Sequence, residues 1–199
     1  MDICRLKNKV LSFLYSVLII IILVGCENNM TKQGIENIEF NCKEVDYAPK
    51  IPEEAETLFQ EARALDLKTG NKNQYHITVL FQQAADKGSW KDEYHLARRY
   101  TLGEGVTRDL KKSQAITDTL VARDIPLGYY ALAMNKDRDI NLKKAAERGN
   151  PQAQYTLGEE AYMVYDYALA KKYYRCAAEQ GVKDAAYALA MRAEISEEN

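Results

Sequence analysis

The sequence predicts an all-α protein, a right-handed solenoid of about nine helices built from repeated helical hairpins. Two sets of landmarks along the chain support this prediction. Three segments share an Ala-Ala-x-x-Gly ending, and one degenerate ending lies between the first and the second. A tyrosine follows each ending after six residues, so the two sets have the same spacings of 36, 25 and 32 residues. The endings are at Gly88, Asp124, Gly149 and Gly181, and the tyrosines are Tyr94, Tyr130, Tyr155 and Tyr187.

Each repeat is predicted to be a helix, a turn and a second helix. Alanines let two helices approach closely, and a glycine after a helix readily adopts the left-handed conformation of a cap. The turn residues 102–106 end one helix, and the pair Ile125-Pro126 ends another. Apolar residues at helical spacing then predict helices at 53–67, at 73–87, through Leu96 and Tyr100, at 109–122, twice and shortened within 126–149, and at 152–163, 166–180 and 183–195.

Residues 1–25 have the features of a secretory signal peptide. Three basic side chains within the first nine residues precede an apolar run of 14 residues, whereas a membrane-spanning helix needs about 20. The segment Leu23-Val24-Gly25-Cys26 resembles the bacterial lipobox, which implies acylation of Cys26 and a lipid anchor in the membrane. Resemblance to enterobacterial lipoproteins favours the outer membrane, facing the periplasm, because Glu27 replaces the aspartate of inner-membrane retention. The alternative is a plain membrane anchor with an incidental cysteine.

Residues 26–52 are polar and are predicted to be a tether ahead of the repeat domain, 53–195. After cleavage of the signal peptide and acylation of Cys26, Cys42 and Cys176 are the only thiols left, and the periplasm is oxidising. We therefore consider a disulfide between them, with the tether running along the stack of repeats. The alternative is a buried thiol at Cys176 and a free thiol at Cys42.

Composition and motifs argue against several classes of function. The formal net charge of −2, with mixed signs, lacks the basic excess of a nucleic-acid binder. Two histidines without a cysteine–histidine cluster make a metal site unexpected. No signature of a serine hydrolase, metalloprotease or phosphate-binding loop occurs, so we expect no catalytic residues, no cofactor and no enzymatic activity.

The repeats resemble the Sel1-like family, a relative of the tetratricopeptide repeats. The matching residues are 102–106 with the sequence Leu-Gly-Glu-Gly-Val, Asp109, Lys112 and the Ala-Ala-x-x-Gly endings. Four further segments, 40–42, 52–63, 124–130 and 174–178, resemble a subgroup of proteobacterial Sel1-repeat lipoproteins. Members of that subgroup are similar to immunity proteins paired with type VI secreted lipase effectors.

A ladder of tyrosines is the best candidate for a binding surface. If the repeats align as in tetratricopeptide proteins, one tyrosine of each first helix faces the concave groove. Tyrosine offers a large contact area and a hydroxyl group, and it is enriched at interfaces. The alternative is that these rings pack between adjacent repeats. The predicted partner-binding residues are Tyr94, Arg98, Tyr130, Tyr155, Glu159 and Tyr187.

The resemblance implies a lipid-anchored protein, a monomer when free, that occludes a secreted phospholipase effector. The alternative is a general envelope adaptor or signalling scaffold that uses the same groove. A third reading, an enzyme like the cysteine-rich Sel1 proteins that hydrolyse β-lactams, is disfavoured because those proteins carry a cysteine pair in each repeat. Here only Cys176 lies inside the repeats.

Overall fold

Helices make up all the regular secondary structure of residues 42–68 and 73–192, the part of the chain that the computed structural model describes. These residues belong to one of two units, residues 40–199. The all-α prediction is confirmed, with nine α-helices in the described part and a short 3-10 helix before them. The predicted signal peptide 1–25, the acylation site Cys26 and residues 27–41 of the tether lie outside the described residues.

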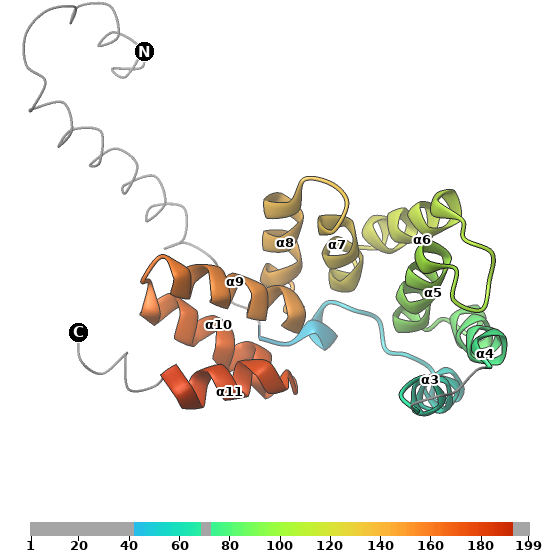
Figure 1. Ribbon diagram of the computed structural model, residues 1–199, viewed down its shortest axis with the longest axis horizontal. Helices are drawn as coiled ribbons and strands as arrows, with labels where there is room; N and C mark the ends of the chain where they lie inside the picture. Colours follow the sequence, from blue (N-terminus) through green and yellow to red (C-terminus); the bar gives the residue numbers. More distant parts are fainter. Residues whose placement is uncertain (1–41, 69–72, 193–199) are drawn as a thin grey trace, which may run out of the picture. The chain divides into compact units, whose positions relative to one another are not determined.

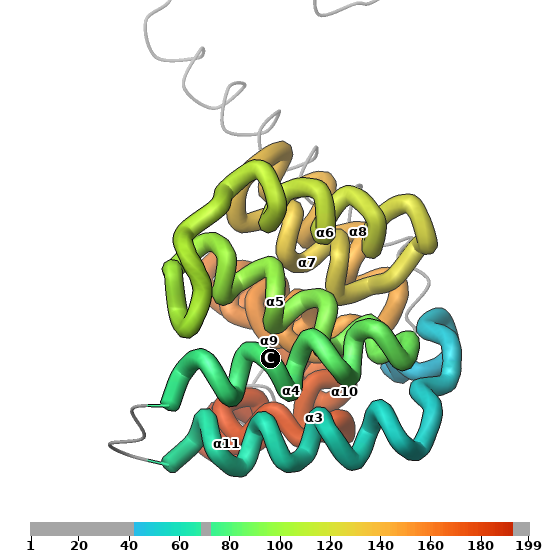
Figure 2. Tube along the Cα trace, turned by 90° about the vertical axis from the view of Figure 1, so that its right-hand side faces the viewer, coloured from blue at the N-terminus to red at the C-terminus, as the bar shows by residue number. Residues whose placement is uncertain are grey.

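The helices pack as consecutive hairpins, each against the next (Figure 1). The pairs α3 with α4, α5 with α6, α7 with α8, and α9 with α10 form the hairpins, and α11 packs on α10. The view of Figure 2 shows α3 and α4 side by side with α5 above them. The bounds are η2 Glu44–Asp46, α3 Glu53–Asp66, α4 Gln74–Asp86, α5 Trp90–Leu102, α6 Leu110–Ala122, α7 Pro126–Ala133, α8 Arg138–Glu147, α9 Pro151–Met163, α10 Tyr167–Glu179 and α11 Lys183–Arg192.

The Ala-Ala-x-x-Gly ending is a helix cap with a defined geometry. The glycine has a positive φ, at +94° for Gly88, +79° for Gly149 and +90° for Gly181. The amide of the next residue donates to a carbonyl five residues back, as Ser89 N does to Ala84 O at 3.1 Å. This is the Schellman arrangement, which satisfies carbonyls that the helix end leaves open. Asp124, at φ +58°, takes the glycine position in the degenerate ending.

The core divides along the stack into local clusters. Phe59, Ile77 and Phe81 join α3 and α4, with Leu96 of α5 packed on them. The last three helices pack mostly through alanines around Tyr174, which is 2% exposed. Each hairpin therefore buries its apolar face against its neighbours, and stability comes from the succession of interfaces.

Residues 42–52, which we call the strap, lie against the helices. Cys42 and Cys176 form a disulfide with their Cα atoms 4.6 Å apart. Glu44 N donates to Gln180 Oε1 at 2.9 Å, and Asn150 Nδ2 donates to Glu44 Oε1 at 2.7 Å. Farther along, Trp90 Nε1 donates to the carbonyl of Pro49 at 2.9 Å. The final eleven residues of the predicted tether are thus bound to the repeat domain.

Candidate protein-interaction surface

The tyrosines of the predicted ladder separate into two groups and one exposed residue. Tyr94 of α5 is half-buried and packs against the cluster of Trp90, Leu120 and Ile125. Tyr130 of α7 is also half-buried, and burial raises the pKa of both tyrosines, so their hydroxyls are neutral. Arg98 lies one turn after Tyr94 and is exposed. In this group, most of the Tyr94 ring is buried against its neighbours, whereas the Arg98 side chain is exposed to solvent.

Tyr155 and Glu159 of α9 lie in a second group with residues of α10 and α11. Tyr174 donates its hydroxyl to Glu159 Oε1 at 2.7 Å, and Arg192 Nη1 donates to the same oxygen at 2.8 Å. Burial alone would raise the pKa of Glu159, but the hydrogen bonds from Arg192 and Tyr174 hold it below its usual value. The Tyr155 ring lies 6.0 Å from that of Tyr174, and the Arg192 guanidinium lies 3.9 Å from the centre of the Tyr162 ring. This charge-paired group joins the last three helices.

Tyr187 of α11 differs from the other three tyrosines because its side chain is 67% exposed. Met191, one turn farther on, is also exposed. The register that the four tyrosines share in sequence therefore does not give them equal access to a partner. Their role in binding stays a prediction, and Tyr187 and Arg98 are the members with free surface.

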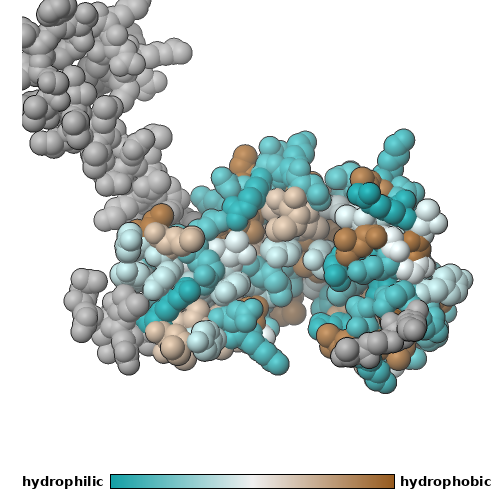
Figure 3. Space-filling view, in the orientation of Figure 1, coloured by the Kyte–Doolittle hydropathy of each residue, from teal (hydrophilic) through white to brown (hydrophobic). Residues whose placement is uncertain are grey.

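A second surface, not predicted from the sequence, lies at the turns inside the hairpins. Exposed apolar side chains recur at the turn between the two helices of each hairpin, and we call this set the turn rim. Figure 1 shows the turns after α5, α7 and α9 at the periphery of the view, whereas the strap crosses its middle. In the view of Figure 3 the surface is mostly hydrophilic, with small separate apolar areas. The turn rim consists of Leu67, Tyr75, Leu102, Leu110, Met134, Ile140, Met163, Val164 and Tyr165.

The turn after α9 carries the most exposed part of the turn rim. Met163, Val164 and Tyr165 are consecutive, and Tyr165 is 78% exposed. Tyr165 also has a positive φ of +64°, a conformation that is unfavourable for a bulky L-residue. The Asp166 amide donates to Ala161 O at 2.9 Å, so Tyr165 occupies the cap position that glycine holds elsewhere. A signal for this site was present in the sequence, as a run of large apolar residues between two predicted helices.

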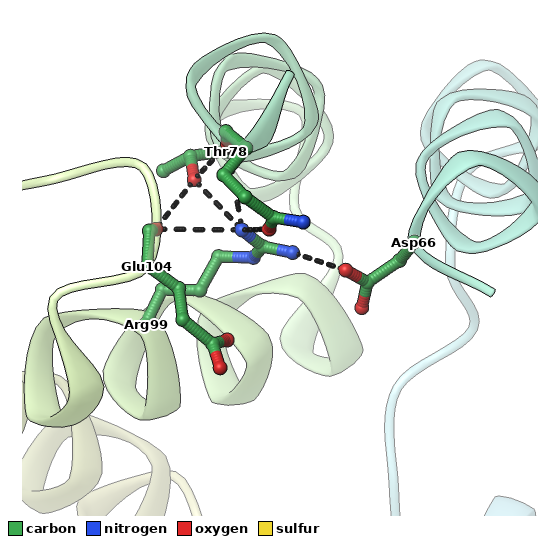
Figure 4. Close-up of polar contacts among 5 residues, drawn as sticks. Asp66, Thr78, Arg99 and Glu104 are labelled. Carbon is green, nitrogen blue, oxygen red and sulfur yellow. Dashed lines mark hydrogen bonds and ion pairs between the residues drawn. The ribbon is translucent and has the colours of Figure 1, made fainter. Parts of the chain in front are cut away.

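A buried arginine holds the first two hairpins together near the turn rim (Figure 4). Arg99 is 2% exposed and pairs with Asp66 at the end of α3 at 2.6 Å. Its Nη1 donates to Thr78 Oγ1 at 3.1 Å and to the carbonyl of Glu104 at 3.3 Å, and it reaches Gln74 Oε1 at 2.9 Å. One guanidinium thus joins the end of α3, the start of α4 and the turn after α5. These three segments carry the exposed Leu67, Tyr75 and Leu102.

No feature of the described residues suggests a catalytic or metal centre. An open hollow of about 820 Å³ lies between the end of the strap and α3, and it is lined by Lys50, Ile51, Pro52, Glu53, Glu56, Thr57 and Gln60. In the described part of the chain, no group of three histidine, cysteine or acidic side chains could hold a metal ion. None of the helices described is long and apolar enough to cross a membrane.

Consecutive helical hairpins with a common capping motif define this chain as a helical-repeat protein. No protein-family model matches the chain, and no curated protein matches it. Solved structures do. The chain is similar to immunity protein Pa5087 from Pseudomonas aeruginosa, with 28% identity, a TM-score of 0.66, and coverage of 80% of this chain and 66% of that one.

Two other solved proteins of Pseudomonas aeruginosa are similar to the same extent. Immunity protein PA5088 is 32% identical with a TM-score of 0.63, over 77% of this chain and 63% of that one. Protein PA5086 is 31% identical with a TM-score of 0.65, over 80% of this chain and 66% of that one. The chain thus spans just under two thirds of the length of these relatives.

Proposed function

We propose that this protein is an immunity protein that binds and neutralises a secreted effector of the phospholipase class, delivered by a type VI secretion system. The observation that carries the proposal is the similarity to two immunity proteins, over about four fifths of the chain. The finer assignment to a phospholipase is supported by the resemblance of residues 40–42, 52–63, 124–130 and 174–178 to immunity proteins of lipase effectors.

The protein acts by steric occlusion. A stable complex buries about 1,200–2,000 Å² in total, and a rigid solenoid offers an extended surface of that size. Exposed aromatic and aliphatic side chains would supply the anchors, and the turn rim and Tyr187 provide them. The effector would act on membrane lipids, which must enter its active site. Covering the entrance of that site is enough to stop the enzyme, so this chain needs no catalytic residues for it.

The protein works at the periplasmic face of the outer membrane, held there by acyl chains on Cys26. Two or more acyl chains give stable anchoring, at about 0.8 kcal/mol for each buried CH₂ group. Radiolabelled palmitate should be incorporated into the wild-type protein and lost in Cys26→Ala. Equal labelling of the two proteins would contradict this location.

The test of the function first searches beside this protein's gene for a gene that encodes a secreted lipase, and then uses the enzyme found there. Periplasmic expression of that enzyme should stop growth, and co-expression of this protein should restore it. A catalytically inactive form of the enzyme should also capture the protein from detergent extracts. A mismatched effector of another reaction class is the control. Failure of both rescue and capture would reject the proposal and leave an envelope scaffold as the alternative.

A further inference from the structure

The strap connects parts of the solenoid that helix packing leaves apart. Extensive helix contacts in the described part join helices that are consecutive in the chain, with a smaller contact between α5 and α7. In a solenoid of this kind, errors in each interface add up along the stack, so the spacing between distant repeats is soft. In Figure 1 the hairpins follow an arc from α3 to α11, and the strap crosses between its two ends.

Each end of the strap is attached to a different hairpin. Its first residue is bonded covalently to Cys176 of α10, and the next residues are held by Asn150 and Gln180 at the two ends of the fourth hairpin. Its last residues contact the second hairpin, where Ala48 and Ile51 pack against Trp90 and its neighbours. The contacts at Cys176 and Trp90 therefore link the fourth hairpin to the second without passing through the third.

A seat for the strap lies where the third hairpin passes to the fourth, between α8 and α9. A Cβ atom at Gly149 would lie 2.5 Å from the carbonyl carbon of Lys43, so only glycine lets the strap cross there. Gly88 and Gly181 end helices in the same left-handed conformation, yet a Cβ atom on either would meet nothing within 4 Å. Gln180 completes the seat, because its Nε2 donates to Gly149 O at 2.8 Å while its Oε1 accepts from Glu44 N.

We propose that the disulfide-bonded strap is a lock on the curvature of the solenoid, which sets the distance between its first and last hairpins. When the Cys42–Cys176 bond is intact, the strap is a tie of fixed length across the arc. Reduction by a dithiol transfers two electrons and two protons to the bond, giving two thiols and an oxidised, cyclic reductant. The covalent attachment of the strap to α10 is then lost. The start of the strap is held by the hydrogen bonds of Glu44, each of which contributes about 1 kcal/mol, while its end stays packed against Trp90, and the arc opens. This lock does not depend on the identity of the partner.

The test measures a distance across the arc in the full-length protein purified in detergent. Glu61 of α3 and Ala186 of α11 are both exposed and are each replaced by a ketone-bearing amino acid that carries the spin label. The ketone reaction leaves the cysteines unmodified. The oxidised protein should give a narrow distance distribution. Reduction, or the double substitution Cys42→Ser with Cys176→Ser, should broaden the distribution and shift its mean by more than its original width. Far-UV circular dichroism should show unchanged helix content.

A glycine pair provides the matched control. Gly149→Ala should shift the distribution in the same way with the disulfide residues intact, because the new methyl group displaces the strap. Gly181→Ala carries the same backbone penalty at positive φ without contacting the strap, and it should leave the distribution unchanged. Coincident distributions for the oxidised, reduced and doubly substituted proteins would overturn the proposal, and so would equal shifts from the two glycine variants.

Discussion

Burial shifts the pKa values of three ionisable side chains, Glu44, Asp92 and His95, toward their neutral forms. Burial raises the pKa of Glu44, in the strap, to about 7, and it raises the pKa of Asp92, near the start of α5, to about 7 as well. Both carboxyls bind a proton more tightly in the folded protein than in the unfolded chain. His95 behaves oppositely, because burial against Phe81 and Phe59 lowers its pKa to about 4.

These shifts predict how stability depends on pH. A raised carboxyl pKa contributes stability that is fully present below the unfolded value near 4.5 and is lost as the pH rises through about 7. Glu44→Gln removes this dependence, so the variant should gain free energy of unfolding relative to wild type between pH 5 and pH 8. Denaturant titrations at both pH values measure the difference. Since both proteins retain His95 and Asp92, their effects cancel. A constant difference across the range would contradict the shifted pKa.

Adjacent arginines give a second prediction at the residue scale. Arg99→Ala leaves Asp66 and several turn oxygens without their donor, and it should cost about 3 kcal/mol of stability. Arg98→Ala, at an exposed position one residue away, should change stability by less than about 0.5 kcal/mol. Urea unfolding compares the two variants, and similar losses for both would mean that the buried network contributes little.

At the scale of helices and turns, the sequence predicts what depends on local interactions. The Ala-Ala-x-x-Gly register predicts the hairpins because the same residues make both the close helix contact and the cap, and the predicted α4 and α10 differ from the observed ones by only one residue at each end. Tyr165 takes a glycine's place in a cap, which no local pattern signals. Counting the remaining thiols predicts the disulfide between Cys42 and Cys176, which is confirmed. The hydrogen bonds of the strap join residues more than 100 positions apart, and the turn rim depends on which side chains stay uncovered, so periodicity could predict neither.

The tyrosines allow a test of packing against exposure. Tyr155→Ala removes a ring that contacts Tyr174 between α9 and α10, and it should destabilise the protein by about 2 kcal/mol. Tyr187→Ala, in the equivalent register of the next repeat but 67% exposed, should change stability by less than about 0.5 kcal/mol. Melting temperatures of the two variants measure the contrast. Equal melting temperatures would show that the ladder does not divide as the structure indicates.

At the scale of the whole repeat domain, the strap and the turn rim have complementary consequences for binding. The strap covers the ends of hairpins where one repeat passes to the next, and the turns within the hairpins keep their apolar side chains exposed. Rigid, exposed aromatic groups bind partners at a low cost in conformational entropy. We therefore expect the proposed effector to contact the turn rim.

Tyr165 allows the decisive measurement on that surface. Tyr165→Asn removes the exposed ring but suits the left-handed backbone, so it should keep or raise the melting temperature. If the turn rim binds the effector, the same variant should weaken the complex by about 2 kcal/mol, roughly 30-fold in Kd. Tyr187→Ala removes another exposed ring, from α11, and tests the groove predicted from the sequence in the same titration. Both rings are exposed, so neither substitution disturbs the core, and a change in affinity reports on the binding surface itself. Loss of affinity in Tyr187→Ala with none in Tyr165→Asn would therefore place the interface at the groove and not at the turn rim.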